Sequence, residues 1–300
     1  MLRYVRKELG RLLCDRIFIL SVLCVCLLNL TNAVAYDYKL DQNVMAFSML
    51  TSSYKDLLKS SAEYSSIGIF CKGISSWVLM FSPVLASMPF IIMLQDEKEN
   101  RTDRAIISRE KKKQYFLGNI IIAMLSGALV MMCGYLLYGI LVNILFPGFG
   151  SYSTELVQDY IDNMTGRPEW YIKLLSGKHL MLVALARLVP AFVFGAVIAL
   201  PGFFLTVITN NGFVCVSMPF FLVYAWEEVM EWLTASLLEK PTEAHIKMTN
   251  IIYNSRVFSI MNSIDNWANI KYAVRTAVIV VLFFAAGYYI INRFKRSCIE

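Results

Sequence analysis

The chain has 300 residues, of which 57% are hydrophobic and only 17% are charged, whereas globular domains carry about 25% charged residues. Together with a mean hydropathy of +0.56, this composition excludes an ordinary soluble domain. The formal net charge is +6, and many of the basic residues that produce it lie in a few short segments.

Six apolar runs are each long enough for a helix to cross the hydrocarbon layer of a bilayer, which takes about 20 residues. None of them alternates apolar and polar residues as the strands of a membrane β-barrel do. We therefore expect an all-α polytopic membrane protein with six transmembrane helices, built as a single transmembrane domain over residues 1–300. The expected spans are 16–36, 73–94, 116–146, 179–209, 212–232 and 273–292.

The basic residues give the expected orientation. Lysine and arginine are concentrated in segments 1–16, 95–115 and 293–300, while the other connections are longer and hold fewer for their length. Cytoplasmic connections of membrane proteins carry this excess of positive charge. We expect both termini, and the 95–115 segment, to be cytoplasmic.

Residues 1–15 have the pattern of an amphipathic helix that lies in the membrane interface. Five apolar residues fall within one arc of a helical projection, and four basic residues lie on the other side, where they would face lipid phosphates. The alternative is a solvated basic tail. The apolar residues are Leu2, Val5, Leu9, Leu12 and Leu13, and the basic residues are Arg3, Arg6, Lys7 and Arg11.

The connections on the other side are expected to carry short helices. Segment 37–72 is expected to hold one or two, and 153–163 reads as another, followed by a turn at 166–168. The residues at 209–212 are typical of a tight helical hairpin turn on the cytoplasmic side.

The segment 95–115 joins the second and third runs and carries a charge density that no membrane interior tolerates, with five acidic and seven basic side chains between residues 96 and 113. A short apolar ridge at Ala105–Ile107 is flanked by arginines, which is the pattern of an amphipathic helix on a surface. The alternative is a solvated loop that only follows the orientation rule.

Two further sets of charged residues lie in or beside the apolar runs. Arg187 is about two turns inside the fourth run, where it either snorkels to the interface or serves an inter-helix pair or a polar translocation path. The fifth run ends in an acidic cluster of Glu227, Glu228 and Glu231. Glu227 and Glu231 share a helix face, so a metal or proton site is conceivable, but an acidic exit from the bilayer is the simpler interpretation.

Motifs of common enzyme sites are absent from the sequence, which contains no GxxxxGK[ST], HExxH, GxSxG or CxxC. The two histidines, His179 and His245, are far apart in sequence, and the seven cysteines read as apolar fillers. We therefore expect no metal site, no cofactor bound by this chain and no enzymatic activity of its own.

The arrangement resembles the type-2 ABC exporter permeases. The matching features are the basic amphipathic lead-in helix, a charged helix between the second and third spans, the tight turn between the fourth and fifth, and an amphipathic segment between the fifth and sixth. The local sequence is also similar. It reads Glu97-x-Glu99-Asn100-Arg101-Thr102-x-Arg104, then Ile107-Ser108-Arg109 and Lys113-Gln114-Tyr115-Phe116-Leu117-Gly118-Asn119.

The resemblance implies a permease subunit in the cytoplasmic membrane that moves an amphiphilic substrate (a peptide, lipid or drug) outward. It implies a second permease subunit, as a homo- or heterodimer, and a separate ABC ATPase subunit that binds ATP-Mg; nucleic acid is not an expected partner. The alternative is a non-transporting membrane sensor, immunity or scaffold protein. The residues implied to form the ATPase-coupling surface are Glu97, Glu99, Arg101, Arg104, Ile106, Ile107 and Arg109.

Overall fold

The computed structural model describes most of the chain. The described residues are 2–37, 42–51, 54–72, 76–100, 112–163, 169–177, 179–209, 211–238, 243–254 and 256–261, with isolated positions at 274, 275, 277, 278, 281, 282 and 287.

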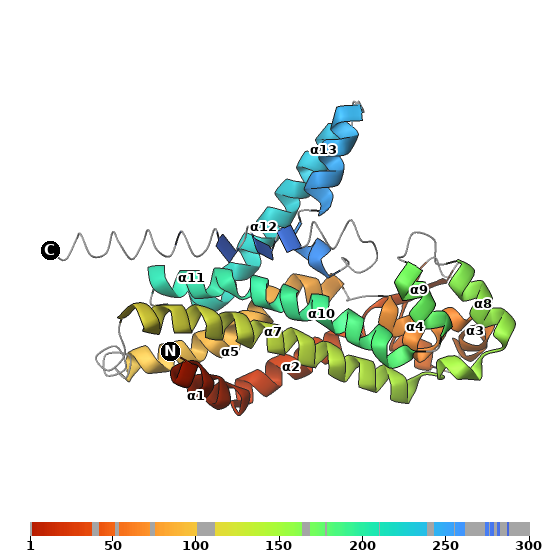
Figure 1. Cartoon of the computed structure of the whole chain (residues 1–300), viewed down its shortest axis with the longest axis horizontal. Coiled ribbons are helices and arrows are strands. Elements are labelled where there is room, and N and C mark those ends of the chain that lie inside the picture. The colour runs from red at the N-terminus through yellow and green to blue at the C-terminus, as the bar shows by residue number, and fades with distance from the viewer. Residues whose placement is uncertain are drawn as a thin grey trace.

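A bundle of long helices forms the body of the protein, and α7 (Lys112–Leu145) packs against most of the others. It contacts α2 (Arg16–Asn29), α5 (Ser76–Glu99) and α10 (Leu180–Ile198), which run alongside it (Figure 1). The 34 residues of α7 make it about 51 Å long, well beyond the roughly 30 Å of a hydrocarbon core. Both ends of α7 can therefore extend past the bilayer core.

The expectation of an all-helical membrane protein is confirmed in its coarse form. Among the described residues, four helical segments are long and apolar enough to cross a membrane: Trp77–Glu99, Gln114–Ser151, Leu180–Ile208 and Gly212–Leu238. A fifth would result from counting Arg3–Leu13 and Arg16–Asn29, bent by 64°, as one span. The run expected at 273–292 lies mostly outside the described residues.

The first expected span is shorter than its apolar run. Helix α2 ends at Asn29, where Asn29 Nδ2 bonds to the carbonyl of Val25 and Thr31 Oγ1 to that of Leu28, so polar side chains take up carbonyls of the last turns. Beyond it, β1 (Ala33–Asp37) pairs antiparallel with β2 (Gln42–Met45), with Ala35 opposite Val44. The expectation of helix through residue 36 was wrong, because β-hairpin pairing takes over at its end.

Short helices gather around this hairpin and the neighbouring end of α7. They are η1 (Ser48–Leu50), α3 (Lys55–Ser60), η3 (Ala62–Tyr64), α4 (Ser66–Cys71), η4 (Phe149–Ser151), α8 (Thr154–Asp162) and α9 (Glu169–Ser176). The helix expected at 153–163 is confirmed as α8, capped by the Ser153 hydroxyl, which accepts a bond from the Leu156 amide. The turn expected at 166–168 lies outside the described residues.

The fourth run is divided into α10 and α11 (Leu200–Ile208) at Ala199, two residues before Pro201, which lacks an amide hydrogen. The fifth run is longer than expected, because α12 (Gly212–Leu238) continues six residues past 232. Helix α13 (Glu243–Asn254) lies against α12, and the pair projects from the bundle (Figure 1). The remaining short element is η5 (Phe258–Ile260).

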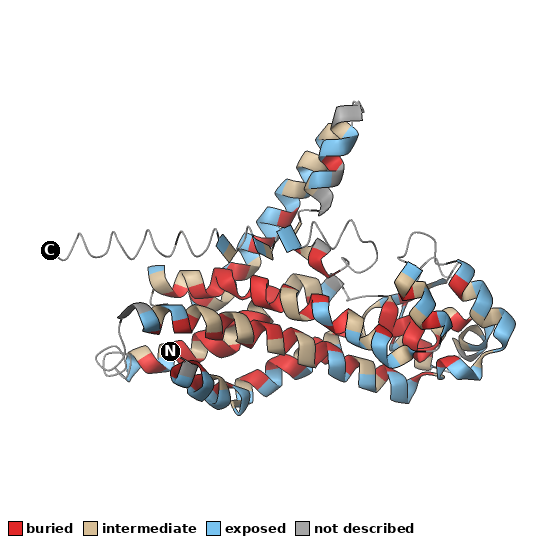
Figure 2. Cartoon of the chain, viewed as in Figure 1, coloured by how far each residue is buried: buried red, intermediate tan, exposed pale blue. Residues whose placement is uncertain are grey.

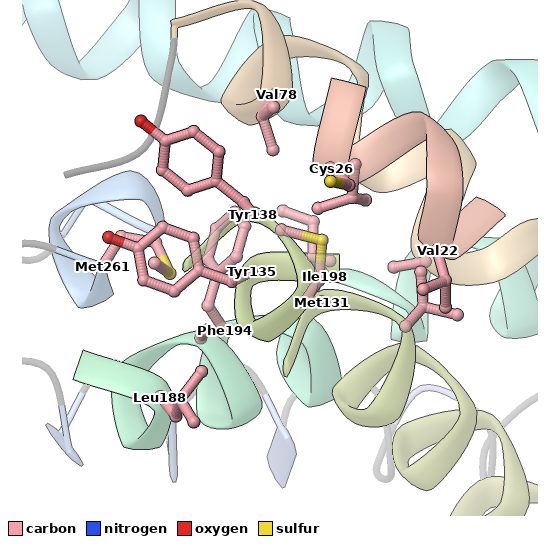
Figure 3. Close-up of a cluster of buried hydrophobic side chains, with 14 of the residues drawn as sticks. Val22, Cys26, Val78, Met131, Tyr135, Tyr138, Leu188, Phe194, Ile198 and Met261 are labelled. Carbon is pink, nitrogen blue, oxygen red and sulfur yellow. The ribbon is translucent and has the colours of Figure 1, made fainter. Parts of the chain in front are cut away.

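Buried residues line the inner faces of α5, α7 and α10, while α12 and α13 are largely exposed (Figure 2). In the core, Tyr135 and Tyr138 of α7 lie close to Phe194 of α10 and Cys26 of α2 (Figure 3). Helices α7 and α10 approach closely where Gly127 faces Gly195, since a Cβ on either residue would overlap the other's backbone. Small residues permit this close approach between apolar helices.

Candidate functional site

Helix α1 (Leu2–Leu13) packs on the bundle with a face other than the fully apolar arc expected from the sequence. Its buried residues are Tyr4, Val5, Glu8 and Leu12, whereas Leu13 is exposed. Tyr4 fits against Gly118 of α7, where a Cβ would come within 2.9 Å of the ring. The basic residues Arg3, Arg6, Lys7 and Arg11 lie on the exposed side, as the projection predicted.

Tyr4 fastens α1 to α7. Its hydroxyl donates a buried hydrogen bond of 2.7 Å to Asn119 Oδ1. Burial raises the pKa of the Tyr4 hydroxyl, and the nearby Glu97 carboxylate raises it further. Tyr4 therefore stays protonated and remains a donor at physiological pH.

Arg11 fastens α1 to the last turn of α5. Its Nη1 lies 3.4 Å from Glu97 Oε1 and 3.6 Å from Glu8 Oε2. The side chains of Glu8 and Glu97 are only 4% and 2% exposed, whereas that of Arg11 is 55% exposed. One half-exposed guanidinium thus faces two buried carboxylates, and it offsets part of the cost of burying them.

The same turn of α5 is held from its other side by α11 and α12. Lys98 Nζ donates a 2.7 Å hydrogen bond to the carbonyl of Thr206, in the last turn of α11. The Gln95 side chain lies against Gly212, the first residue of α12, where a Cβ would overlap it. At the start of α12, Asn211 Oδ1 accepts from the Phe213 amide at 3.1 Å. Because α11 ends at Ile208, α12 begins at Gly212 and the two helices are in contact, the short connection expected there is confirmed.

We call this arrangement the α5 junction: Gln95, Glu97 and Lys98 with Arg11, Glu8, Thr206 and Gly212. Only residues 99 and 100 separate it from the charged segment 101–111. Of the expected coupling surface, Glu99 is exposed, but Glu97 is buried and faces α1. The other expected coupling residues, Arg101, Arg104, Ile106, Ile107 and Arg109, lie outside the described residues.

Arg187 lies near the opposite end of the bundle. It is buried, with its guanidinium carbon 5.6 Å from the centre of the Tyr171 ring, which belongs to α9. A snorkelling side chain would instead place its charged head in water. Of the interpretations open at the level of sequence, this geometry favours a contact between helices, here a cation–π contact.

The acidic cluster on α12 is joined to a residue that sequence reasoning missed. Arg256 Nε lies 2.6 Å from Glu227 Oε2, and Nη2 lies 3.3 Å from Glu231 Oε2. Glu227 Oε1 also accepts the Phe258 amide at 3.2 Å, while Glu228 is exposed. Arg256 is the only arginine between Arg187 and Arg275 in the sequence, and this isolation was the signal that could have identified it as the partner of the acidic cluster. An ion pair joins this helix face to the segment between α13 and η5.

Within the described part of the chain, no group of three or more His, Cys, Asp or Glu residues is arranged to hold a metal ion. The fold and the described site define a class: an α-helical, multi-pass membrane protein whose polar contacts tie helices to one another. Comparison with protein-family models, with curated proteins and with solved structures finds no match for the chain.

Proposed function

We propose that the chain is the transmembrane permease subunit of an ABC exporter in the cytoplasmic membrane. It pairs with a second permease subunit and moves an amphiphilic substrate outward. A separate ATPase subunit binds and hydrolyses ATP-Mg, and docks on the charged segment between α5 and α7. Both chain termini lie on the cytoplasmic side, together with this segment.

The observation that carries the proposal is the α5 junction. Glu97 and Lys98, in the turn that leads into the charged segment, are bound to α1 through Arg11 and to α11 through Thr206. The helix that follows the segment, α7, is bound to α1 through the Tyr4–Asn119 hydrogen bond. A force on the charged segment therefore acts on α5 and α7 directly, and on α1 and α11 through these contacts.

This arrangement suits the transfer of work from a partner subunit to the membrane helices. The Tyr4–Asn119 hydrogen bond is buried and Glu97 contributes a buried carboxylate to its ion pair, so a displaced segment moves its neighbours with it. Glu99 and the charged residues 101–111 supply a polar surface of the kind found at transient interfaces. Glu97 acts within the chain, as a link to α1, rather than as part of the docking surface.

Isolation from the native membrane tests the proposal. The full-length chain, extracted in a mild detergent through an affinity tag, should retain an ATP-binding subunit that mass spectrometry identifies. The double variant E99K/R104E should lose most of that subunit, because both changes reverse charge at the docking surface.

The matched control is E155K, a charge reversal at an exposed position of α8, at the other end of the bundle. It should retain the subunit as the native chain does. Retention by E99K/R104E would remove the docking assignment. Absence of any ATP-binding subunit from the native chain would overturn the permease assignment in favour of a sensor, immunity or scaffold role.

A further inference from the structure

An apolar pocket of about 400 Å³ lies between α4, α7 and α10, toward the end of the bundle that carries the short helices. Its inner wall includes Phe70 and Leu188, both buried. The Phe70 ring packs against α7 at Gly139, since a Cβ on residue 139 would come within 2.8 Å of the ring. Phe70 and Gly139 thus form part of the pocket wall.

The rim of the pocket is apolar and exposed. Met181 is 78% exposed, Ile140 is 50% exposed and Leu185 is 47% exposed, and all three line the pocket. Ile140 belongs to the candidate span Gln114–Ser151, and Met181 and Leu185 to Leu180–Ile208. The pocket is thus continuous with surfaces that, in a membrane protein, face hydrocarbon.

Polar groups are confined to one end of the pocket. The Ser66 hydroxyl donates to Asn143 Oδ1 at 3.2 Å. In this bond Asn143 Oδ1 is the acceptor. The side-chain amide hydrogens of Asn143 can donate to a carbonyl oxygen. From Leu180 at that end to Leu188 at the other, α10 rises about 12 Å. The pocket is therefore elongated, with a hydrogen-bonding end and an apolar end.

We propose that this pocket binds one acyl chain of a membrane phospholipid. The chain lies along α7 and α10, with its ester carbonyl at Asn143 and its methyl end towards Leu188. The pocket opens on surfaces that face hydrocarbon, and leaving it unfilled deprives its apolar lining of dispersion contacts. An acyl chain that enters from the bilayer through the exposed rim restores those contacts. The site does not depend on an ATPase subunit.

Photolabelling of the full-length chain tests this site. The chain is reconstituted in vesicles of phosphatidylethanolamine and phosphatidylglycerol that contain a small fraction of a photoactivatable phosphatidylcholine. One probe carries a diazirine near the ester of an acyl chain and a second carries it near the methyl end. We expect the first to label residues around Asn143 and Met181, and the second to label residues around Leu136 and Leu188.

The variant A184L places a larger side chain in the pocket, and A225L makes the same change at an exposed position of α12. Labelling of the pocket should fall about tenfold in A184L, equivalent to about 1.4 kcal/mol of binding, and stay unchanged in A225L. Equal labelling in A184L and the native chain would overturn the proposal. So would identical labelling patterns from the two probes in the native chain, a result that does not depend on any variant folding.

Discussion

Arg11 and Glu97 lie 86 residues apart in the sequence, yet their side chains form an ion pair with Nη1 and Oε1 3.4 Å apart. The pair ties the N-terminal helix α1 to the turn of α5 that precedes the charged segment. Glu8 of α1 lies beside the same guanidinium, so Arg11 forms ion pairs with two buried carboxylates. Helix α1 is therefore a packed part of the bundle rather than an independent tail.

Replacing Arg11 by alanine should destabilise the protein. The change leaves Glu8 and Glu97 buried without this guanidinium, and we expect a loss of about 1–3 kcal/mol, below the value for a fully buried pair because Arg11 is half exposed. Thermal unfolding in detergent measures it. R6A, which removes an exposed arginine from the same helix, should have little effect. Adding E97Q to R11A should restore part of the loss, and equal stability of R11A and R6A would contradict this role.

Lys98 should stabilise the end of α11. Its ammonium group donates to the Thr206 carbonyl in the last turn of that helix, where the helix dipole favours a positive charge. We expect K98M to cost about 1 kcal/mol and to increase amide hydrogen exchange in the last turn of α11 and at 211–212. E99Q, at the next and exposed position, is the control. If both variants exchange like the native chain, the Lys98 contact does not restrain this turn.

Gly127 should be intolerant of any side chain. A Cβ there would overlap the Gly195 carbonyl and come within 2.6 Å of Ala199 Cβ, so α7 and α10 would have to separate. Overpacking of this kind costs about 1–3 kcal/mol, and G127A should lower the midpoint of thermal unfolding accordingly. Gly10 of α1 has no neighbour within 4 Å of an added Cβ, so G10A should be neutral or slightly stabilising. The prediction fails if G127A is as stable as G10A.

The lengths of the apolar runs predicted the helical class correctly. The predicted helix ends were inaccurate where polar residues lie inside a run or where apolar residues follow it. The run 16–36 contains Asn29, Thr31 and Asn32 before its last apolar residues, and the helix stops there. The run 212–232 is followed by apolar Leu233, Leu237 and Leu238, and α12 continues through them. Boundaries depend on single polar side chains and on tertiary packing, which a hydropathy window averages out.

The site was predictable only where its residues are close in sequence. The turn between α11 and α12 follows from adjacent polar residues, and the basic face of α1 from helical periodicity. By contrast, the buried face of α1 contains Tyr4, because its hydroxyl donates to Asn119, 115 residues further along the chain, and Glu97 of α5 is buried opposite Arg11 of α1. The pairing of Glu227 with Arg256 likewise joins α12 to a residue 29 positions further on, between α13 and η5. Such long-range partners determine which charged residues are buried, and local sequence contains little of that information.

Arg256 should hold η5 and the end of α13 against α12. Its guanidinium binds Glu227, whose side chain is 5% exposed, and Glu231, so R256A leaves a buried carboxylate without this partner. We expect R256A to cost about 2–4 kcal/mol and to increase proteolysis between α13 and η5, whereas R256M/E227Q should be closer to the native chain in both measurements. E228Q, which alters the exposed neighbour of Glu227, is the control and should change neither. Native-like stability and protease resistance of R256A would show that the ion pair does not restrain this segment.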